Sequence, residues 1–240
     1  MKPNPQSRHA GPPLLMLAVI HIFLYASSLV AGSVLRYGSA YVNPYGSSQS
    51  VQNFFANSPQ ATRVSTFFFL GSAVLLGLFT ATVVSRLRFL GVRAAGTYIA
   101  LFGGFAASIA LAISALFSWV LSISDIVSSS AALVHALYFV SFLFGGIGFA
   151  VGFGLLAAGV SVTSYFGHLL PRWLVAFGMV IASAGEFSSL SLLTYPASFL
   201  LPVTRFGGFL WLIAVAVLLP RTRDGNGELM KEGTDGRAHR

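Results

Sequence analysis

Three ionisable side chains, Glu186, His21 and His135, stand inside long apolar stretches of the sequence. Glu186 lies in "IASAGEFSSL" and is the only Asp, Glu, Lys or Arg between Trp173 and Thr204. Desolvation disfavours a charged carboxylate, so a buried one is either protonated and hydrogen-bonded or ionised beside a cation. An imidazole can share a proton with such a group or form an ion pair with it. Glu186 and a histidine are therefore the first candidates for chemistry.

The elements that must position these residues are helices in lipid. The chain has 240 residues, of which 55% are hydrophobic and 8% charged, and its mean hydropathy is +0.80. A soluble domain needs about a quarter of its residues charged, so this exterior is expected to face lipid. The net charge of +8 comes from short basic clusters between apolar runs. Nucleic acid is not an expected partner, because binding it requires a basic face.

Six segments have about the 20 mostly apolar residues that a membrane-crossing helix needs. The sequence therefore predicts an all-α, polytopic helical bundle with six transmembrane helices. Pro196 and Pro202 separate the last two spans, and the stretch 158–171 is expected to break the long apolar run before them. The predicted spans are residues 13–35, 64–85, 94–121, 129–158, 172–194 and 200–220.

Three segments are expected outside the bilayer. Residues 1–12 and 221–240 are polar or charged and are predicted to be disordered cytoplasmic tails. Residues 37–62 are predicted to form the one substantial outer loop, in which "VQNFFANS" forms a short interfacial helix. The membrane domain is thus residues 13–220.

Lysine and arginine placement predicts the orientation, because these residues concentrate in cytoplasmic loops. With both termini inside (N-in/C-in), eleven of the fourteen basic residues lie on the inner side and three on the outer side. The inner set is Lys2, Arg8, Arg86, Arg88, Arg93, Arg172, Arg221, Arg223, Lys231, Arg237 and Arg240, and the outer set is Arg36, Arg63 and Arg205.

Small residues predict where the helices pack, since close backbone approach drives helix association in lipid. The third span carries Gly96, Ala100, Gly104 and Ser108 at four-residue spacing, and the fourth carries the pair Gly148 and Gly152. Both spans are expected to pack tightly against neighbours.

Depth estimates bring Glu186 and His135 together. At 1.5 Å of rise per residue, Glu186 lies about 21 Å above the inner end of the fifth span, and His135 about 9 Å below the outer end of the fourth. In a hydrocarbon core of about 30 Å these depths are similar. The sequence predicts an outer-half polar pocket lined by Glu186, His135 and Tyr138, with an arginine at its rim (Arg36, Arg63 or Arg205).

Three interpretations of Glu186 remain open. It belongs to a ligand or proton site in that pocket, it is a polar tether between the fourth and fifth spans, or it faces lipid. His21 lies about 12 Å above the inner end of its span and is expected to hydrogen-bond between helices.

No catalytic residue, metal or cofactor is predicted. A bis-histidine haem needs two ligands at one level, whereas His21 and His135 differ by about 9 Å in depth. Zinc needs at least three His, Asp or Glu ligands. The sequence has no G-x-S-x-G, P-loop or H-E-x-x-H pattern, and it has no cysteine.

Several stretches resemble a bacterial membrane family known as domain of unknown function 4386. They are "NFFANSPQATRVSTFFFLGSAVLLGLFTATVVSRLR" (53–88), "GHLLPRWLVAFGMVIASAG" (167–185) and "FGGFLWLIAVAVLLP" (206–220). The resemblance implies a six- or seven-helix protein of the bacterial cytoplasmic (inner) membrane with unassigned activity. It supplies no catalytic residues.

Two functions are compatible with these features. The first is a non-enzymatic membrane module that binds or moves a small amphiphile or a partner helix. The alternative is an intramembrane enzyme or proton-coupled carrier that uses Glu186 and His135.

Overall fold

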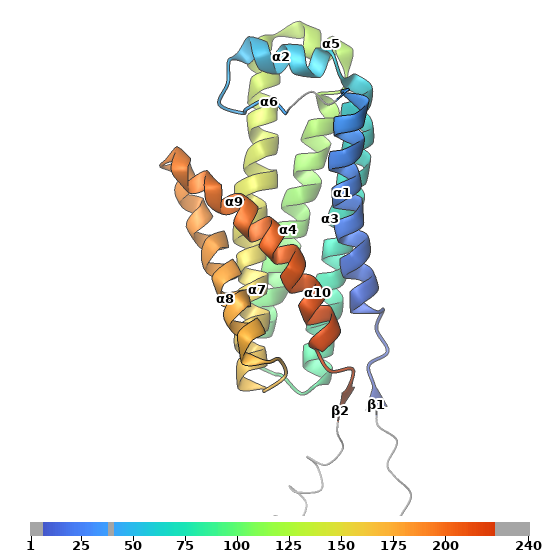
Figure 1. Ribbon diagram of the computed structural model, residues 1–240, viewed down its shortest axis with the longest axis vertical. Coiled ribbons are helices and arrows are strands. Elements are labelled where there is room, and N and C mark those ends of the chain that lie inside the picture. The colour runs from blue at the N-terminus through green and yellow to red at the C-terminus, as the bar shows by residue number, and fades with distance from the viewer. Residues whose placement is uncertain (1–6, 38–40, 224–240) are drawn as a thin grey trace, which may run out of the picture.

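The computed structural model describes residues 7–37 and 41–223. Within them, six helices are long and apolar enough to cross a membrane, and they lie side by side as one bundle (Figure 1). The predicted all-α bundle is confirmed, and the chain is a multi-pass membrane protein. The first three spans are α1 (Leu14–Leu35), α3 (Pro59–Phe89) and α4 (Gly96–Val120).

The fourth span is longer than the sequence predicts. It runs through α6 (Ala131–Leu143), the π-helical segment η1 (Phe144–Gly148) and α7 (Phe149–Phe166), a total of 36 residues. This length rises about 54 Å, well beyond a hydrocarbon core of about 30 Å. The break does fall within the expected stretch 158–171 but only at its far end, because Gly159 packs closely on α4 and the helix continues to Phe166.

The last two spans are irregular where they meet. The fifth is α8 (Arg172–Phe187) with the 3₁₀ turn η2 (Ser188–Leu192). The sixth begins with the 3₁₀ turn η3 (Tyr195–Phe199), α9 (Leu200–Pro202) and the π-helical η4 (Val203–Gly207), and ends with α10 (Gly208–Leu218). The tip of this pair leans away from the other helices (Figure 1).

Two short helices cover one end of the bundle, which we call the loop end (Figure 1). They are α2 (Ser48–Ala56) and α5 (Ser124–Ser129). The hydroxyl of Ser47 accepts a hydrogen bond from the Ser50 amide at the start of α2, as N-cap residues do. Val51 and Phe55 of α2 are buried against the ends of the long helices. The structure thus contains the short helix expected within 37–62.

The two ends of the described chain meet at the opposite end of the bundle, which we call the terminal end (Figure 1). Strands β1 (Ser7–Arg8) and β2 (Thr222–Arg223) pair antiparallel. The expectation of disorder was wrong for these residues because backbone hydrogen bonds order them. Residues 1–6 and 224–240 of the predicted tails lie outside the described residues. An even number of spans places both ends of the membrane domain on the same side of the membrane, which agrees with the pairing of β1 and β2.

Glycines set the contact between α4 and α7. A Cβ atom on Gly152 would lie 2.6 Å from the backbone nitrogen of Ala107, and one on Gly159 would lie 2.5 Å from the Gly96 carbonyl oxygen. Gly104, by contrast, meets Thr80 of α3. The predicted stripe of small residues therefore serves two neighbours: its first half packs on α7 and its second half on α3.

We expect Gly152→Ala to lower the thermal unfolding midpoint in detergent. The new methyl group must displace helix backbone, and overpacking of this kind costs about 1–3 kcal/mol. Gly148→Ala is the matched control, because its nearest neighbour would be at 3.4 Å, an ordinary contact. Equal midpoint shifts in the two variants would contradict this account of the packing.

His9 holds the paired ends against α3. Its Nδ1 accepts a hydrogen bond from the Gly11 amide at 3.1 Å, and its Nε2 lies 3.0 Å from the Ser85 hydroxyl. Partial burial and the nearby positive charge of Arg86 hold the pKa of His9 below its ordinary value. The folded arrangement therefore favours the neutral ring.

Acidification should loosen this contact. Because the pKa of His9 is lowered in the folded state, its stabilising effect is complete above the ordinary histidine pKa and is lost as the pH falls below it. Hydrogen exchange at the His9 amide, which donates to the Arg221 carbonyl, should speed up from pH 7.5 to 5 after correction for intrinsic rates. His9→Gln should abolish that pH dependence, and an unchanged profile in this variant would count against the role of His9.

Candidate functional site

Glu186 and His135 do not meet. The Glu186 carboxylate lies beside Gly154 of α7, with Oε1 3.1 Å from where a Cβ on that glycine would stand. Gly154 follows His135 by 19 residues on the same continuous helix, which corresponds to about 28 Å of rise. The predicted pair was wrong because the fourth helix is far longer than a hydrocarbon core of about 30 Å requires, ends eight residues beyond the predicted span and carries His135 to the loop end.

His135 anchors the loop-end segment before α2. Its Nδ1 lies 2.9 Å from the Ser48 hydroxyl, and its Nε2 donates to the Pro44 carbonyl oxygen at 2.7 Å. Both ring nitrogens are therefore used in holding this segment on α6. His135 is a tether, but between α6 and the loop rather than between the fourth and fifth spans.

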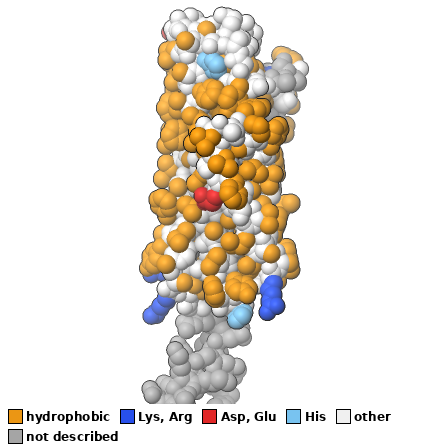
Figure 2. Space-filling model, turned by 90° about the vertical axis from the view of Figure 1, so that its left-hand side faces the viewer, with side chains coloured by type: hydrophobic (Ala, Val, Ile, Leu, Met, Phe, Trp, Pro, Cys, Tyr) orange, Lys and Arg blue, Asp and Glu red, His pale blue; other side chains and the backbone are white. Residues whose placement is uncertain are grey.

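Glu186 stands on the outer surface of α8. It is exposed, and so are its apolar neighbours Val180, Phe187 and Leu190. Figure 2 shows an acidic side chain in the middle of a largely hydrophobic face. Of the three interpretations of Glu186, this placement agrees with a lipid-facing carboxylate.

Three other residues of the predicted pocket do come together. Arg36, Tyr138 and Arg205 line a cavity near the loop end, between α1, α3, α4, α6 and η4. It consists of two adjoining pockets of about 220 and 300 Å³, which we call its first and second lobes. We call it the loop-end cavity. The two lobes share the lining residues Tyr25, Tyr41, Phe69, Tyr138 and Arg205.

Arg36 is buried at the end of α1 and folds back over the helix. Its side chain is 7% exposed, and its Nη2 donates to the Tyr41 hydroxyl at 3.1 Å. The guanidinium also stands over the rings of Tyr41 and Phe54, at 4.2 and 4.8 Å from their centres. Nε and Nη1 have no hydrogen-bond partner among the described residues. A Cβ on Gly32 would lie 2.9 Å from Nη2, so glycine makes this fold-back possible.

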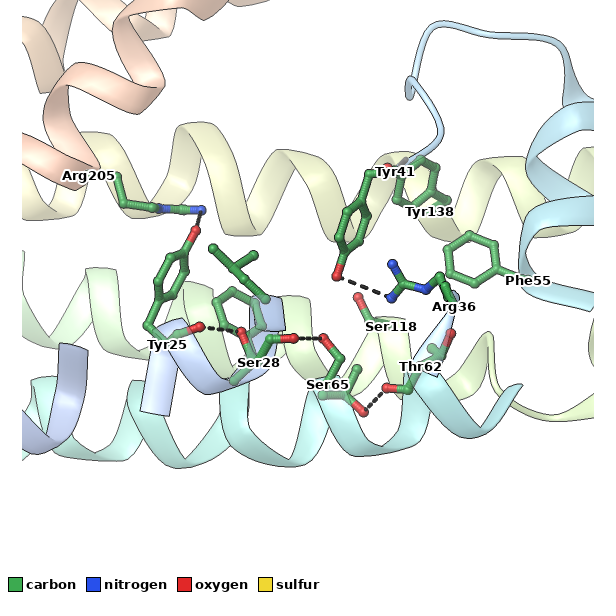
Figure 3. A pocket seen from close by; sticks show the side chains of 13 residues that line it. Tyr25, Ser28, Arg36, Tyr41, Phe55, Thr62, Ser65, Ser118, Tyr138 and Arg205 are labelled. Atoms are coloured by element: carbon green, nitrogen blue, oxygen red, sulfur yellow. Dashed lines mark hydrogen bonds between the residues drawn. The ribbon is translucent and has the colours of Figure 1, made fainter. Parts of the chain in front are cut away.

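Arg205 lies deeper and has its own partners. Its Nη1 donates to the Tyr25 hydroxyl at 2.9 Å, and its Nη2 donates to the Gly145 carbonyl. Arg205 belongs to the π-helical η4, which follows Pro202, and Gly145 belongs to the π-helical η1. Single π-helical turns within α-helices are frequent at functional sites, and here two of them meet at one arginine. Figure 3 shows Arg36 and Arg205 at opposite ends of the first lobe.

Hydroxyl groups lie between the two arginines (Figure 3). The Ser28 hydroxyl donates to the Tyr25 carbonyl and the Ser65 hydroxyl to the Ser28 carbonyl, which links α1 to α3. The Tyr138 hydroxyl donates to the Val42 carbonyl at 2.8 Å. These hydroxyl protons are therefore already committed to backbone oxygens.

The sequence reasoning missed most of this lining, although a signal for it exists. Buried residues on α1 recur at helical spacing from His21 through Tyr25 and Ser28 to Gly32, one turn before Arg36. This polar stripe faces the bundle. His21 fulfils its expected role, since its Nδ1 bonds the Ser72 carbonyl of α3 at 2.8 Å.

Arg63 is not part of the cavity. It is exposed on α3 and donates to the hydroxyl and carbonyl of Ser122. Only two acidic residues occur among residues 7–37 and 41–223, Asp125 on α5 and Glu186 on α8, and neither lines the cavity. Across the same described ranges, no group of three or more metal-binding side chains occurs.

Comparisons with protein-family models, with curated proteins and with solved structures find no match to this chain. The resemblance to domain of unknown function 4386 therefore stays a prediction. The fold and site define a multi-pass helical membrane protein with a polar, arginine-containing cavity near one end.

The separation of Glu186 and His135 can be tested by a double-mutant cycle. The free energies of unfolding lost in Glu186→Gln and His135→Ala should add within about 0.5 kcal/mol in the double variant, because residues this far apart do not couple. The measurement is equilibrium unfolding in detergent. A coupling energy above about 1 kcal/mol would restore the idea of a shared pair.

Proposed function

We propose that the protein is a non-enzymatic membrane module that binds or moves a small amphiphile in the loop-end cavity. The observation that carries this proposal is that the lining of the cavity changes from polar to apolar along its length. Arg36 and the hydroxyl groups make one part strongly polar, whereas Leu29 and Phe206, 39% and 53% exposed, stand at its apolar margins. Clefts of a few hundred Å³ with few polar groups are typical of small-molecule sites.

The two lobes suit a molecule with a polar head and a short apolar chain. Lobe volumes of about 220 and 300 Å³ are too small to hold a partner helix. The exposed margins lie on α1 and η4, both on the surface that faces lipid. An amphiphile could therefore keep part of its chain in the bilayer while its head lies inside the bundle.

We propose further that the terminal end faces the cytoplasm, so that the cavity lies in the outer half of the membrane. Arginines at the terminal end, such as Arg88 and Arg172, support this orientation through the positive-inside rule. Figure 2 shows basic side chains at that end of the molecule. The location in a bacterial cytoplasmic membrane rests on the family resemblance.

The alternative function, an enzyme or proton-coupled carrier that uses Glu186 and His135, lacks this kind of support. Both nitrogens of His135 are engaged with the loop, and Glu186 stands about 28 Å of helix away. No other observation favours it.

Filling the cavity should remove the bound amphiphile. Ser65→Phe places an aromatic ring in the first lobe, whereas Ser183→Phe, the matched control, adds the same ring on the exposed face of α8. Native mass spectrometry of protein extracted from its membrane should show a small-molecule adduct on the wild type and on Ser183→Phe but not on Ser65→Phe. Circular dichroism and size-exclusion chromatography must first show that both variants are folded. The same adduct pattern in all three proteins would contradict the proposal.

A further inference from the structure

We infer that the head group of the ligand is an oxyanion, such as a carboxylate, and that Arg36 binds it. This inference rests on the proposed amphiphile-binding function and names the chemical class of its ligand. It begins from an imbalance of charge in the loop-end cavity.

Arg36 cannot lose its charge inside the bundle. A guanidinium stays protonated in proteins and carries five N–H donors. Burial of such a group is costly unless it is paired and hydrogen-bonded. Only 7% of the Arg36 surface is exposed. Two of its three side-chain nitrogens nevertheless lack a hydrogen-bond partner among the described residues.

The chain supplies only partial compensation. The Tyr41 hydroxyl accepts one hydrogen bond, and the Tyr41 and Phe54 rings offer their negative faces. Cation–π contacts of this kind attract the positive charge but leave the Nε and Nη1 donors unmet. The acceptor that would meet them is missing from the described part of the chain.

No carboxylate of the chain is placed to neutralise Arg36. Among the described residues Asp125 and Glu186 lie outside the lining, as the site geometry shows. The other four acidic residues of the sequence all follow Arg223, which pairs at the terminal end. Residues 38–40, which lie outside the described part of the chain, are Gly, Ser and Ala and carry no charge. A bound anion is the counter-charge that the site lacks.

The positive charge of Arg205 also favours an anion in the cavity, although Arg205 does not contact the head group. Its Nη1 and Nη2 are occupied by Tyr25 and Gly145, so its role is to add positive charge rather than to contact the head group. Arg36 keeps unmet donors on Nε and Nη1, which lie on different edges of the planar guanidinium, so an oxygen of the head group can accept from either of them. Charge-assisted hydrogen bonds are about twice as strong as neutral ones.

The test compares ten-carbon amphiphiles that differ in the head. Protein in a neutral maltoside detergent at pH 8 is titrated with decanoate, decan-1-ol or decyltrimethylammonium, and thermal unfolding reports binding. Wild-type protein should bind decanoate at least tenfold more tightly than decan-1-ol and should not respond to decyltrimethylammonium. Acetate alone, as the free anion without a chain, should bind at least tenfold more weakly than decanoate.

Arg36→Gln should remove the preference for decanoate, and Arg36→Lys, which keeps the charge, should retain much of it. Arg63→Gln is the matched control, since it removes an arginine near the loop end that does not line the cavity. If Arg36→Gln fails to fold, the comparison of decanoate with decan-1-ol on the wild-type protein still tests the preference for an oxyanion.

The possible failures are distinguishable. Equal binding of decanoate and decan-1-ol, both weakened by Ser65→Phe, would overturn the oxyanion inference and leave amphiphile binding intact. Binding of none of the three amphiphiles would overturn the proposed function together with the inference. Acetate binding as tight as that of decanoate would show a site for a small free anion and would overturn the role of the chain.

Discussion

The site depends on one constraint, the permanent positive charge of Arg36. This charge is buried near one end of a helical bundle that lipid surrounds. Arg36 is held at the end of α1 by Tyr41 and Phe54 and is brought back over the helix by Gly32. Unpaired charge in such a setting is costly, and ionisable groups kept there are functional candidates by default. The cavity beside Arg36 is thus best understood as space for the missing counter-charge.

The helical frame keeps that space open. Glycines at the α4–α7 contact let two long helices touch along their backbones, whereas α1 and α3 are joined by polar contacts such as those of His21 with Ser72 and Ser65 with Ser28. The sixth span closes the side of the cavity with irregular turns, and its π-helical segment presents Arg205 to Gly145 of the long fourth helix. Apolar side chains of α1 and α3, such as Leu17 and Leu76, complete the core nearer the terminal end, and the loop-end cavity lies beyond them, where hydroxyl groups and arginines replace this apolar contact.

Much of the fold could be predicted from the sequence, because lipid imposes a simple rule on apolar length. All six spans follow from it, and so does the small-residue packing of the third and fourth spans. The end of the fourth helix could not be predicted, because Gly159 and the polar residues that follow it are typical of a break until the close contact of Gly159 with α4 is known. The eight residues by which the helix exceeds the predicted span correspond to about two turns. Together with the assumption that the helix fits a core of about 30 Å, they produced the false pair with Glu186. Arg36, Tyr138 and Arg205 were predicted to lie around Glu186 and His135, whereas they line a cavity without those two residues. Their arrangement depends on the fold-back at Gly32 and on two π-helical turns, which no local pattern specifies.

The central claim is that a bound anion completes the environment of Arg36. The most direct measurement is a high-resolution density map of protein purified from its own membrane in a neutral detergent. The account predicts density for a small head group within hydrogen-bonding distance of Nε or Nη1 of Arg36, continuing as a chain toward Leu29 or Phe206. A loop-end cavity that holds only ordered water around a fully solvated guanidinium would contradict it.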